Sequence, residues 1–206
     1  MNATILTVGT EGDVRPFIAL ALGLTREGHT VRLAANKNFA DLVTKSGLAF
    51  APLSGDYRAL AAEVQSILQA GLGVFTVPRI MRRALVPMAQ HWAEEGSDAC
   101  TDADLIIGSG AADCLGASIA EAFAKPCALA YLQPLVPSYN IPPVVFPPRS
   151  DAYIPLVNIS FHYMFRLFLW HVVKPACNVI RRSLGLHPYP WYGPNGVHLT
   201  ICGVQS

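Results

Sequence analysis

The chain has 206 residues, of which 52% are apolar and 14% are charged, a balance that excludes a disordered chain. A charged share well under the roughly 25% of average soluble proteins indicates an apolar face that is exposed or covered by something else. Fifteen Lys and Arg against fourteen Asp and Glu give a net charge of +1, which excludes the basic footprint of a nucleic-acid-binding protein.

Short apolar runs alternate with helical patterns in the first part of the chain. Strands are predicted at residues 5–8, 30–35 and 48–52, and helices at 13–28 and 39–45. Asp13 is placed as the N-cap of the first helix and Pro16 in its first turn. This alternation predicts a parallel sheet with right-handed crossovers.

The same alternation continues to the end of the chain. Helices are predicted at 57–70, 76–95, 114–123 and 156–184, and strands at 105–108, 127–132 and 197–202. Seven prolines between 134 and 155 predict a long irregular loop, which is usually functional or mobile. The fold class is therefore α/β, a single Rossmann-like doubly wound parallel sheet over residues 1–206.

The helix predicted at 156–184 is the most apolar part of the sequence. Its charges make it unsuitable as a membrane span, and His162, Arg166 and Lys174 mark one polar stripe on an otherwise wide apolar face. Three readings stay open: a core helix, the wall of a site for a lipophilic ligand, and contact with a membrane surface.

The opening residues predict no signal peptide, and the five cysteines are scattered without a paired spacing. Reduced thiols and a cytoplasmic location are expected, with peripheral attachment to a membrane as the alternative. The six histidines show no metal-binding spacing, so no metal site is predicted.

Ligands of doubly wound sheets bind beyond the carboxyl ends of the strands, which brings the loops at 9–13, 54–57, 108–113 and 134–148 to one cleft. Gly9, Thr10 and Gly12 form a candidate phosphate loop at a helix N-terminus, although the pattern also fits a plain tight turn. Asp13 is a candidate general base or a helix cap, and Asp113 has the same two readings.

Residues 7–24, TVGTEGDVRPFIALALGL, are followed by a Gly28-His29-Thr30-Val31 segment. Together they resemble the opening of the sterol glucosyltransferases and of the antibiotic glycosyltransferases of the vancomycin type. These are nucleotide-sugar-dependent enzymes of the two-domain GT-B fold. Similar segments follow at 47–56, 104–107 and 116–127, so the resemblance covers nearly the whole chain.

The resemblance implies that residues 1–206 are the N-terminal, acceptor-binding domain of an inverting glycosyltransferase. Asp13 would remove the proton of the acceptor hydroxyl, and a hexose, glucose from UDP-glucose, would pass to a sterol or to a polyketide or phenolic natural product. The nucleotide sugar would be a co-substrate held by a C-terminal domain, with no cofactor and no metal.

An apolar cleft with few polar groups would suit such an acceptor. Each candidate lining residue could equally pack the domain. The candidates are Phe17, Tyr57, Asp113, Leu135, Tyr139, Phe146 and Phe165.

Two features depart from the family pattern. Glu11 stands where the family usually has arginine and adds a negative charge beside the loop. The donor motif of the second domain is not found, so the chain is expected to be a fragment, a truncated product or a half that works with a partner, with a homodimer as one way to cover its apolar face. A non-catalytic binding or partner module with this fold is the alternative function, and an unrelated nucleotide-binding Rossmann protein is a third.

Overall fold

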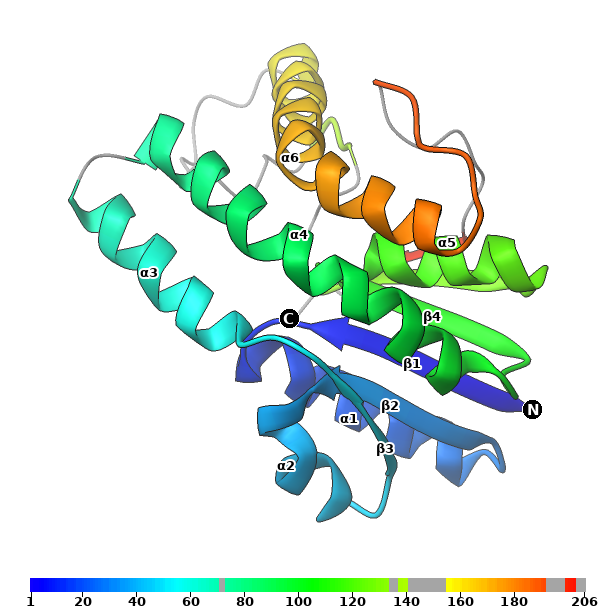
Figure 1. Cartoon of the computed structure of the whole chain (residues 1–206). Coiled ribbons are helices and arrows are strands. Elements are labelled where there is room, and N and C mark those ends of the chain that lie inside the picture. Colours follow the sequence, from blue (N-terminus) through cyan, green and yellow to red (C-terminus); the bar gives the residue numbers. More distant parts are fainter. Residues whose placement is uncertain (71–72, 134–136, 141–154, 192–198, 203–206) are drawn as a thin grey trace.

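Six parallel strands form the centre of the molecule, and helices cover both of their faces (Figure 1). The computed structural model describes residues 1–70, 73–133, 137–140, 155–191 and 199–202. The spatial order of the strands, β3-β2-β1-β4-β5-β6, is that of a doubly wound sheet, which confirms the predicted fold class. The strands are β1 (Asn2–Val8), β2 (Thr30–Asn36), β3 (Ala49–Leu53), β4 (Leu105–Gly110), β5 (Cys127–Tyr131) and β6 (Leu199–Cys202).

The helices connect these strands as the periodicity predicts. They are α1 (Glu11–Arg26), the 3₁₀ turn η1 (Lys37–Phe39), α2 (Ala40–Thr44), α3 (Tyr57–Gln69), α4 (Gly73–Cys100), α5 (Asp113–Phe123) and α6 (Pro155–Ser183). After α1 and after α2 the chain turns at Gly28 and Gly47, whose φ angles of +83° and +80° favour glycine.

Two hydrophobic cores lie on the two faces of the sheet. On one face, Val14 and Phe17 of α1 pack with Ile5 of β1. On the other, α4, α5 and α6 cover the strands, and the buried Trp92 packs in the same cluster as Leu115. Because both faces are covered, the central strands read in the sequence as continuous apolar runs.

β1 and β4 lie side by side in the sheet, but the helices that follow them, α1 and α5, pack on opposite faces. In open α/β sheets, ligands bind at the carboxyl ends of the strands where the order reverses in this way. Val8 and Gly110 are register partners at that end. The predicted loops around Asp13 and Asp113 therefore flank this topological switch point.

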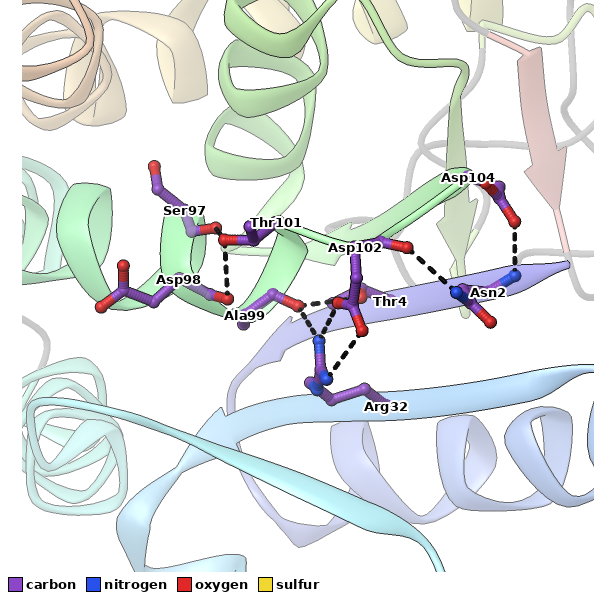
Figure 2. A network of polar contacts seen from close by, with 9 residues as sticks. All are labelled: Asn2, Thr4, Arg32, Ser97, Asp98, Ala99, Thr101, Asp102 and Asp104. Carbon is purple, nitrogen blue, oxygen red and sulfur yellow. Dashed lines mark hydrogen bonds and ion pairs between the residues drawn. The ribbon is translucent and has the colours of Figure 1, made fainter.

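A polar network closes the opposite, amino edge of the sheet (Figure 2). Arg32 donates to the carbonyl of Ala99 at 2.7 Å and forms a two-pronged ion pair with Asp102 at 2.5 and 3.1 Å. The hydroxyl of Thr4 donates to the same carbonyl at 3.1 Å, and the backbone N–H of Asn2 donates to the carboxylate of Asp104. These contacts tie the starts of β1 and β2 to the end of α4.

The starts of two helices differ from the prediction. Thr10, not Asp13, is the N-cap of α1, and Asp13 is the third residue of the helix, where its carboxylate reaches back to the cap. Pro16 consequently lies inside the helix rather than in its first turn. Asp113 is the first residue of α5 and not its cap, which is Ala112.

Cys100, Cys114, Cys127 and Cys177 are free thiols. Burial raises the pKa of Cys100 to about 12 and that of Cys127 to about 11, so both thiols stay protonated at neutral pH. In the part of the chain that the structure describes, no helix is long and apolar enough to cross a membrane. The same residues hold no group of three potential metal ligands.

Candidate functional site

The loop between β1 and α1 holds the carboxylate of Asp13 at the switch point. Its Oδ2 atom accepts hydrogen bonds from the backbone N–H of Thr10 at 2.7 Å and from the Thr10 hydroxyl at 2.9 Å. Among the described residues nothing donates to Oδ1. One oxygen therefore caps the helix, and the second can accept a proton or a hydrogen bond from a ligand.

The two glycines of this loop differ in what they permit. A Cβ at Gly9 would come within 2.6 Å of Cγ and 2.7 Å of Cβ of Asp13, closer than real side chains approach. A Cβ at Gly12 would meet only the hydroxyl of Thr10, at 3.8 Å. A glycine is therefore required at position 9 for the carboxylate to lie where it does. At position 12, in the exposed first turn of α1, there is room for a side chain.

The negative charge of Glu11 does not stand alone beside this loop. Its carboxylate accepts a hydrogen bond from Nε of Arg15 at 2.6 Å, one helical turn away, and both side chains are exposed. The pair therefore lies on the exposed surface of α1.

Tyr57, the first residue of α3, links Asp13 to the next part of the site. Burial raises the pKa of its phenol, and the negative charge of Asp13 raises that pKa further. The two side chains come from different loops at the carboxyl edge. They are nevertheless close enough to interact electrostatically.

Partly buried polar contacts fix the segment that leads into α3. Glu95 of α4 accepts hydrogen bonds from the backbone N–H of Ser54, at 2.6 Å, and from its hydroxyl. The indole N–H of Trp92 donates to the carbonyl of Ser54 at 2.6 Å, and Nδ2 of Asn36 donates to that of Gly55 at 3.1 Å. The segment is thus fastened to both α4 and β2, which sets where α3 begins.

An apolar cavity of about 400 Å³ lies between α3, α4 and α6. Tyr57 and Gln65 are the polar side chains among those that line it, and a volume of this size is within the range of small-molecule sites, roughly 300–1,000 Å³. The lining residues are Tyr57, Leu60, Ala61, Val64 and Gln65 of α3, Val77, Pro78 and Met81 of α4, and Phe168, Leu169, Val172 and Val173 of α6.

Asp113 occupies the equivalent position after β4, at the start of α5. The hydroxyl of Tyr131 donates to its Oδ2 at 3.1 Å, and the backbone N–H of Cys114 donates to Oδ1. Both carboxylate oxygens of Asp113 are thus engaged, in contrast to Asp13.

The other predicted lining residues have different locations. Phe17 is 3% exposed in the core beneath α1, on the face of the sheet away from the cavity, and is a packing residue. Phe165 is half-buried on α6 but is not among the cavity-lining residues. Tyr139 is exposed, and its carbonyl accepts a hydrogen bond from Asn158 of α6. Leu135 and Phe146 lie outside the described residues.

Sequence reasoning missed two components of this site. Glu95 and Trp92 lie in a helix that the pattern identifies, but no local signal shows that they fasten Ser54, about forty residues earlier. Apart from Phe168, which is largely exposed, the lining residues from α4 and α6 lie on inner helix faces whose apolar pattern is equally that of core packing. Only the arrangement of the three helices in space shows which apolar residues line the cavity and which pack in the core.

The fold is that of the N-terminal half of a GT-B glycosyltransferase. The same fold is found in the glycosyltransferase SsfS6 of Streptomyces sp. SF2575, with a TM-score of 0.53 and 21% sequence identity over 92% of this chain and 48% of that one. Residues 3–124 match the Glycosyltransferase family 28 N-terminal domain, and the chain belongs to this family.

Curated relatives extend the similarity beyond residue 124. The chain is 31% identical to a sterol 3-beta-glucosyltransferase of Debaryomyces hansenii, over 90% of this chain and 12% of the relative. It is also 31% identical to the sterol 3-beta-glucosyltransferase UGT80B1 of Arabidopsis thaliana, over 93% of this chain and 32% of the relative. The chain thus spans at most about a third of the length of these two relatives.

Proposed function

We propose that residues 1–206 are the acceptor-binding domain of an inverting glycosyltransferase that acts on a lipophilic alcohol. The acceptor, of the sterol or polyketide and phenolic class, lies in the cavity between α3, α4 and α6 with its hydroxyl toward Asp13. The donor is a nucleotide sugar, UDP-glucose, held by a C-terminal domain or a separate partner chain. A membrane and a second copy of the chain are further partners in this proposal.

The chemistry requires one base on this domain. Asp13 takes the proton of the acceptor hydroxyl through its Oδ1 atom, and the acceptor oxygen attacks the anomeric carbon from the face opposite the nucleoside diphosphate. A new C–O bond forms, the bond from the anomeric carbon to the diphosphate oxygen breaks, and the configuration inverts. The proton ends on Asp13 and the electron pair on the departing diphosphate.

The observation that carries the proposal is the double role of Tyr57. Its side chain lines the apolar cavity, and the pKa of its phenol is raised by burial and, in addition, by the charge of Asp13. A base next to an apolar cavity is the arrangement that transfer to a lipophilic hydroxyl requires. The similarity to sterol 3-beta-glucosyltransferases supports the acceptor class.

A non-catalytic binding module is the second candidate. It is favoured by the capping contacts of Asp13, because two hydrogen bonds from Thr10 give this carboxylate a structural role without any reaction. In that case the cavity binds a lipophilic ligand that is not glycosylated.

Asp13→Asn separates the two candidates. The variant chain is supplied with a donor domain from a sterol glucosyltransferase, and transfer of labelled glucose to a sterol is measured. We expect kcat/KM to fall by about 10²–10⁴-fold, the usual contribution of a general base, with an unchanged Kd for the sterol. Asp41→Asn, at an exposed first-turn position of α2, is the matched control and retains the full rate. Full activity of Asp13→Asn would leave Asp13 as a cap alone.

A further inference from the structure

The hydroxyl of Tyr57 is a polar group of the candidate site that has no role in the proton transfer to Asp13. Tyr57 is half-buried at the start of α3, where its side chain lines the apolar cavity. Among the described residues no hydrogen bond of this hydroxyl is found, and its interaction with Asp13 is electrostatic only. A phenol that faces an apolar cavity usually has a hydrogen-bond partner, so this hydroxyl points to a polar atom of a ligand.

The environment of Tyr57 makes its hydroxyl a hydrogen-bond donor. Burial raises the pKa of the phenol above its ordinary range, and the negative charge of Asp13 raises that pKa further. The hydroxyl therefore keeps its proton at neutral pH and can donate it in a hydrogen bond, whereas the ionised carboxylate of Asp13 can only accept. The two side chains thus present one donor and one acceptor at the same end of the cavity.

The backbone that leads to Tyr57 is held in place before any ligand binds. Nδ2 of Asn36 and the indole N–H of Trp92 donate to the two backbone carbonyls of residues 54–55, at 3.1 and 2.6 Å. The backbone N–H of the first of these residues donates to Glu95 at 2.6 Å. Figure 1 shows α3 beginning close to the start of α1, beyond the end of β1. A donor on such a fixed segment is oriented in advance, as a site that acts on a ligand hydroxyl requires.

The oxygen of an acceptor alcohol has four directions in which it forms bonds or hydrogen bonds. One is the bond to its own carbon, and the O–H points to Oδ1 of Asp13. One lone pair attacks the anomeric carbon, which leaves the second lone pair for a donor. We propose that the hydroxyl of Tyr57 donates a hydrogen bond to this lone pair and so turns the acceptor O–H toward Asp13. The assignment rests on the proposed function, because it requires the acceptor hydroxyl to lie beside Asp13.

The hydrogen bond from Tyr57 acts during the transfer as well as during binding. As Asp13 takes the proton, negative charge grows on the acceptor oxygen before its bond to the anomeric carbon is complete, and a fixed donor stabilises that charge. Tyr57 keeps its own proton throughout, so the proton still ends on Asp13 and the electron pair on the departing diphosphate. Loss of the hydroxyl should therefore slow the transfer more than it weakens the binding of the acceptor.

Two ligands that differ by one hydroxyl test the proposal without a donor domain. The Kd values of cholesterol and of its deoxy analogue, which lacks only the hydroxyl, are measured for the unaltered chain and for Tyr57→Phe. We expect the variant to bind cholesterol about three- to tenfold more weakly, the usual contribution of one hydrogen bond. The deoxy analogue should bind the variant as tightly as the unaltered chain or more tightly. An unchanged preference for cholesterol over the deoxy analogue in Tyr57→Phe overturns the proposal.

Two further variants separate the hydroxyl of Tyr57 from its ring. Tyr57→Ala removes both and should weaken the binding of cholesterol and of the deoxy analogue alike, because the ring lines the cavity. Tyr163→Phe is the matched control, since it removes the hydroxyl of a tyrosine of α6 that is 58% exposed and does not line the cavity. Its Kd values for both ligands should be those of the unaltered chain. Circular dichroism first establishes that each variant is folded.

Glucose transfer distinguishes a failure of this proposal from a failure of the proposed function. With a donor domain supplied, we expect kcat of Tyr57→Phe to fall by at least about tenfold, in addition to the weaker binding of cholesterol. If Tyr57→Phe transfers at the full rate while Asp13→Asn does not, the proposed function stands and the role of Tyr57 is overturned. If the unaltered chain binds neither ligand, the acceptor class is wrong and the role of Tyr57 fails with it.

Discussion

At the amino edge of the sheet, where the strands begin, polar groups are paired in hydrogen bonds. At the carboxyl edge, where the strands end, two side-chain acceptor atoms have no hydrogen-bond donor among the described residues. The guanidinium of Arg32 donates hydrogen bonds to both the carbonyl of Ala99 and the carboxylate of Asp102. At the other end, Oδ1 of Asp13 has no donor among the described residues, and neither does the buried Oδ1 of Asn36. The same strands thus end in a closed network on one side and in unused hydrogen-bonding capacity on the other.

This difference indicates which edge stabilises the fold and which binds a ligand. Buried polar groups are nearly always paired, so unpaired acceptors at a strand end point to a ligand or to water. The apolar cavity lies at this second edge, beginning at Tyr57. Substitutions at the amino edge should therefore change stability and leave binding alone, while those at the carboxyl edge should do the opposite.

Gly9→Ala is expected to have the largest effect. The added methyl group displaces the side chain of Asp13, and a misplaced catalytic group by about 1 Å can cost on the order of 10²-fold in rate. Glucose transfer in the presence of a donor domain measures the loss. Gly12→Ala, with space for its methyl group, should keep its activity within about twofold of the unaltered chain. Equal losses in the two variants would show that the loop acts through its flexibility and not through the position of Asp13.

Filling the cavity should have the next largest effect. Ala61→Trp places an indole among the lining residues of α3, and we expect the Kd for a fluorescent sterol to rise by about tenfold or more, equivalent to about 1.4 kcal/mol. Ala62→Trp adds the same group at the exposed neighbouring position and should bind normally. Unchanged sterol binding by a folded Ala61→Trp chain would move the acceptor site elsewhere.

The contrast between the edges also shows how far the sequence predicts the molecule. Buried strands such as β1 and β4 can be recognised in the sequence as apolar runs, because both faces of the sheet are covered. The predicted N-cap of α1, Asp13, lies three residues after the observed one, Thr10, because both are typical capping residues. The pair in fact forms a reciprocal cap with Thr10 first.

The site was predictable only where it is local. Asp13, Gly9 and Gly12 lie within five residues of one another, so their chemistry is visible in the sequence. The fastening of Ser54 by Glu95, and the enclosure of a cavity by three helices, depend on contacts between distant segments. Periodicity gives the inner face of a helix, but it does not tell what that face meets.

Arg32→Met tests the contribution of the polar network at the amino edge of the sheet. The ion pair lowers the pKa of Asp102, so its contribution to stability is complete above about pH 4, the ordinary range of Asp, and is lost as the pH falls through the lowered value. The variant should be less stable at neutral pH, and its deficit should be smaller near pH 2, where only the lost hydrogen bond to the carbonyl of Ala99 still separates it from the unaltered chain once Asp102 is protonated. Thermal unfolding at both pH values measures this, with the exposed Arg58→Met as the control. A deficit of the same size at both pH values would exclude the ion pair as its cause.

The smallest expected effect tests whether Asp13 and the cavity form one site. Because the charge of Asp13 opposes ionisation of the neighbouring phenol, Asp13→Asn should lower the pKa of Tyr57, whereas the larger contribution, which comes from burial, persists. Ultraviolet difference titration follows the phenolate, and Tyr57→Phe identifies which of the seven tyrosine transitions belongs to this residue. Asp41→Asn should leave the titration unchanged. An unaltered Tyr57 transition in Asp13→Asn would separate the carboxylate from the cavity, and the carboxyl edge would then hold two independent features instead of one acceptor site.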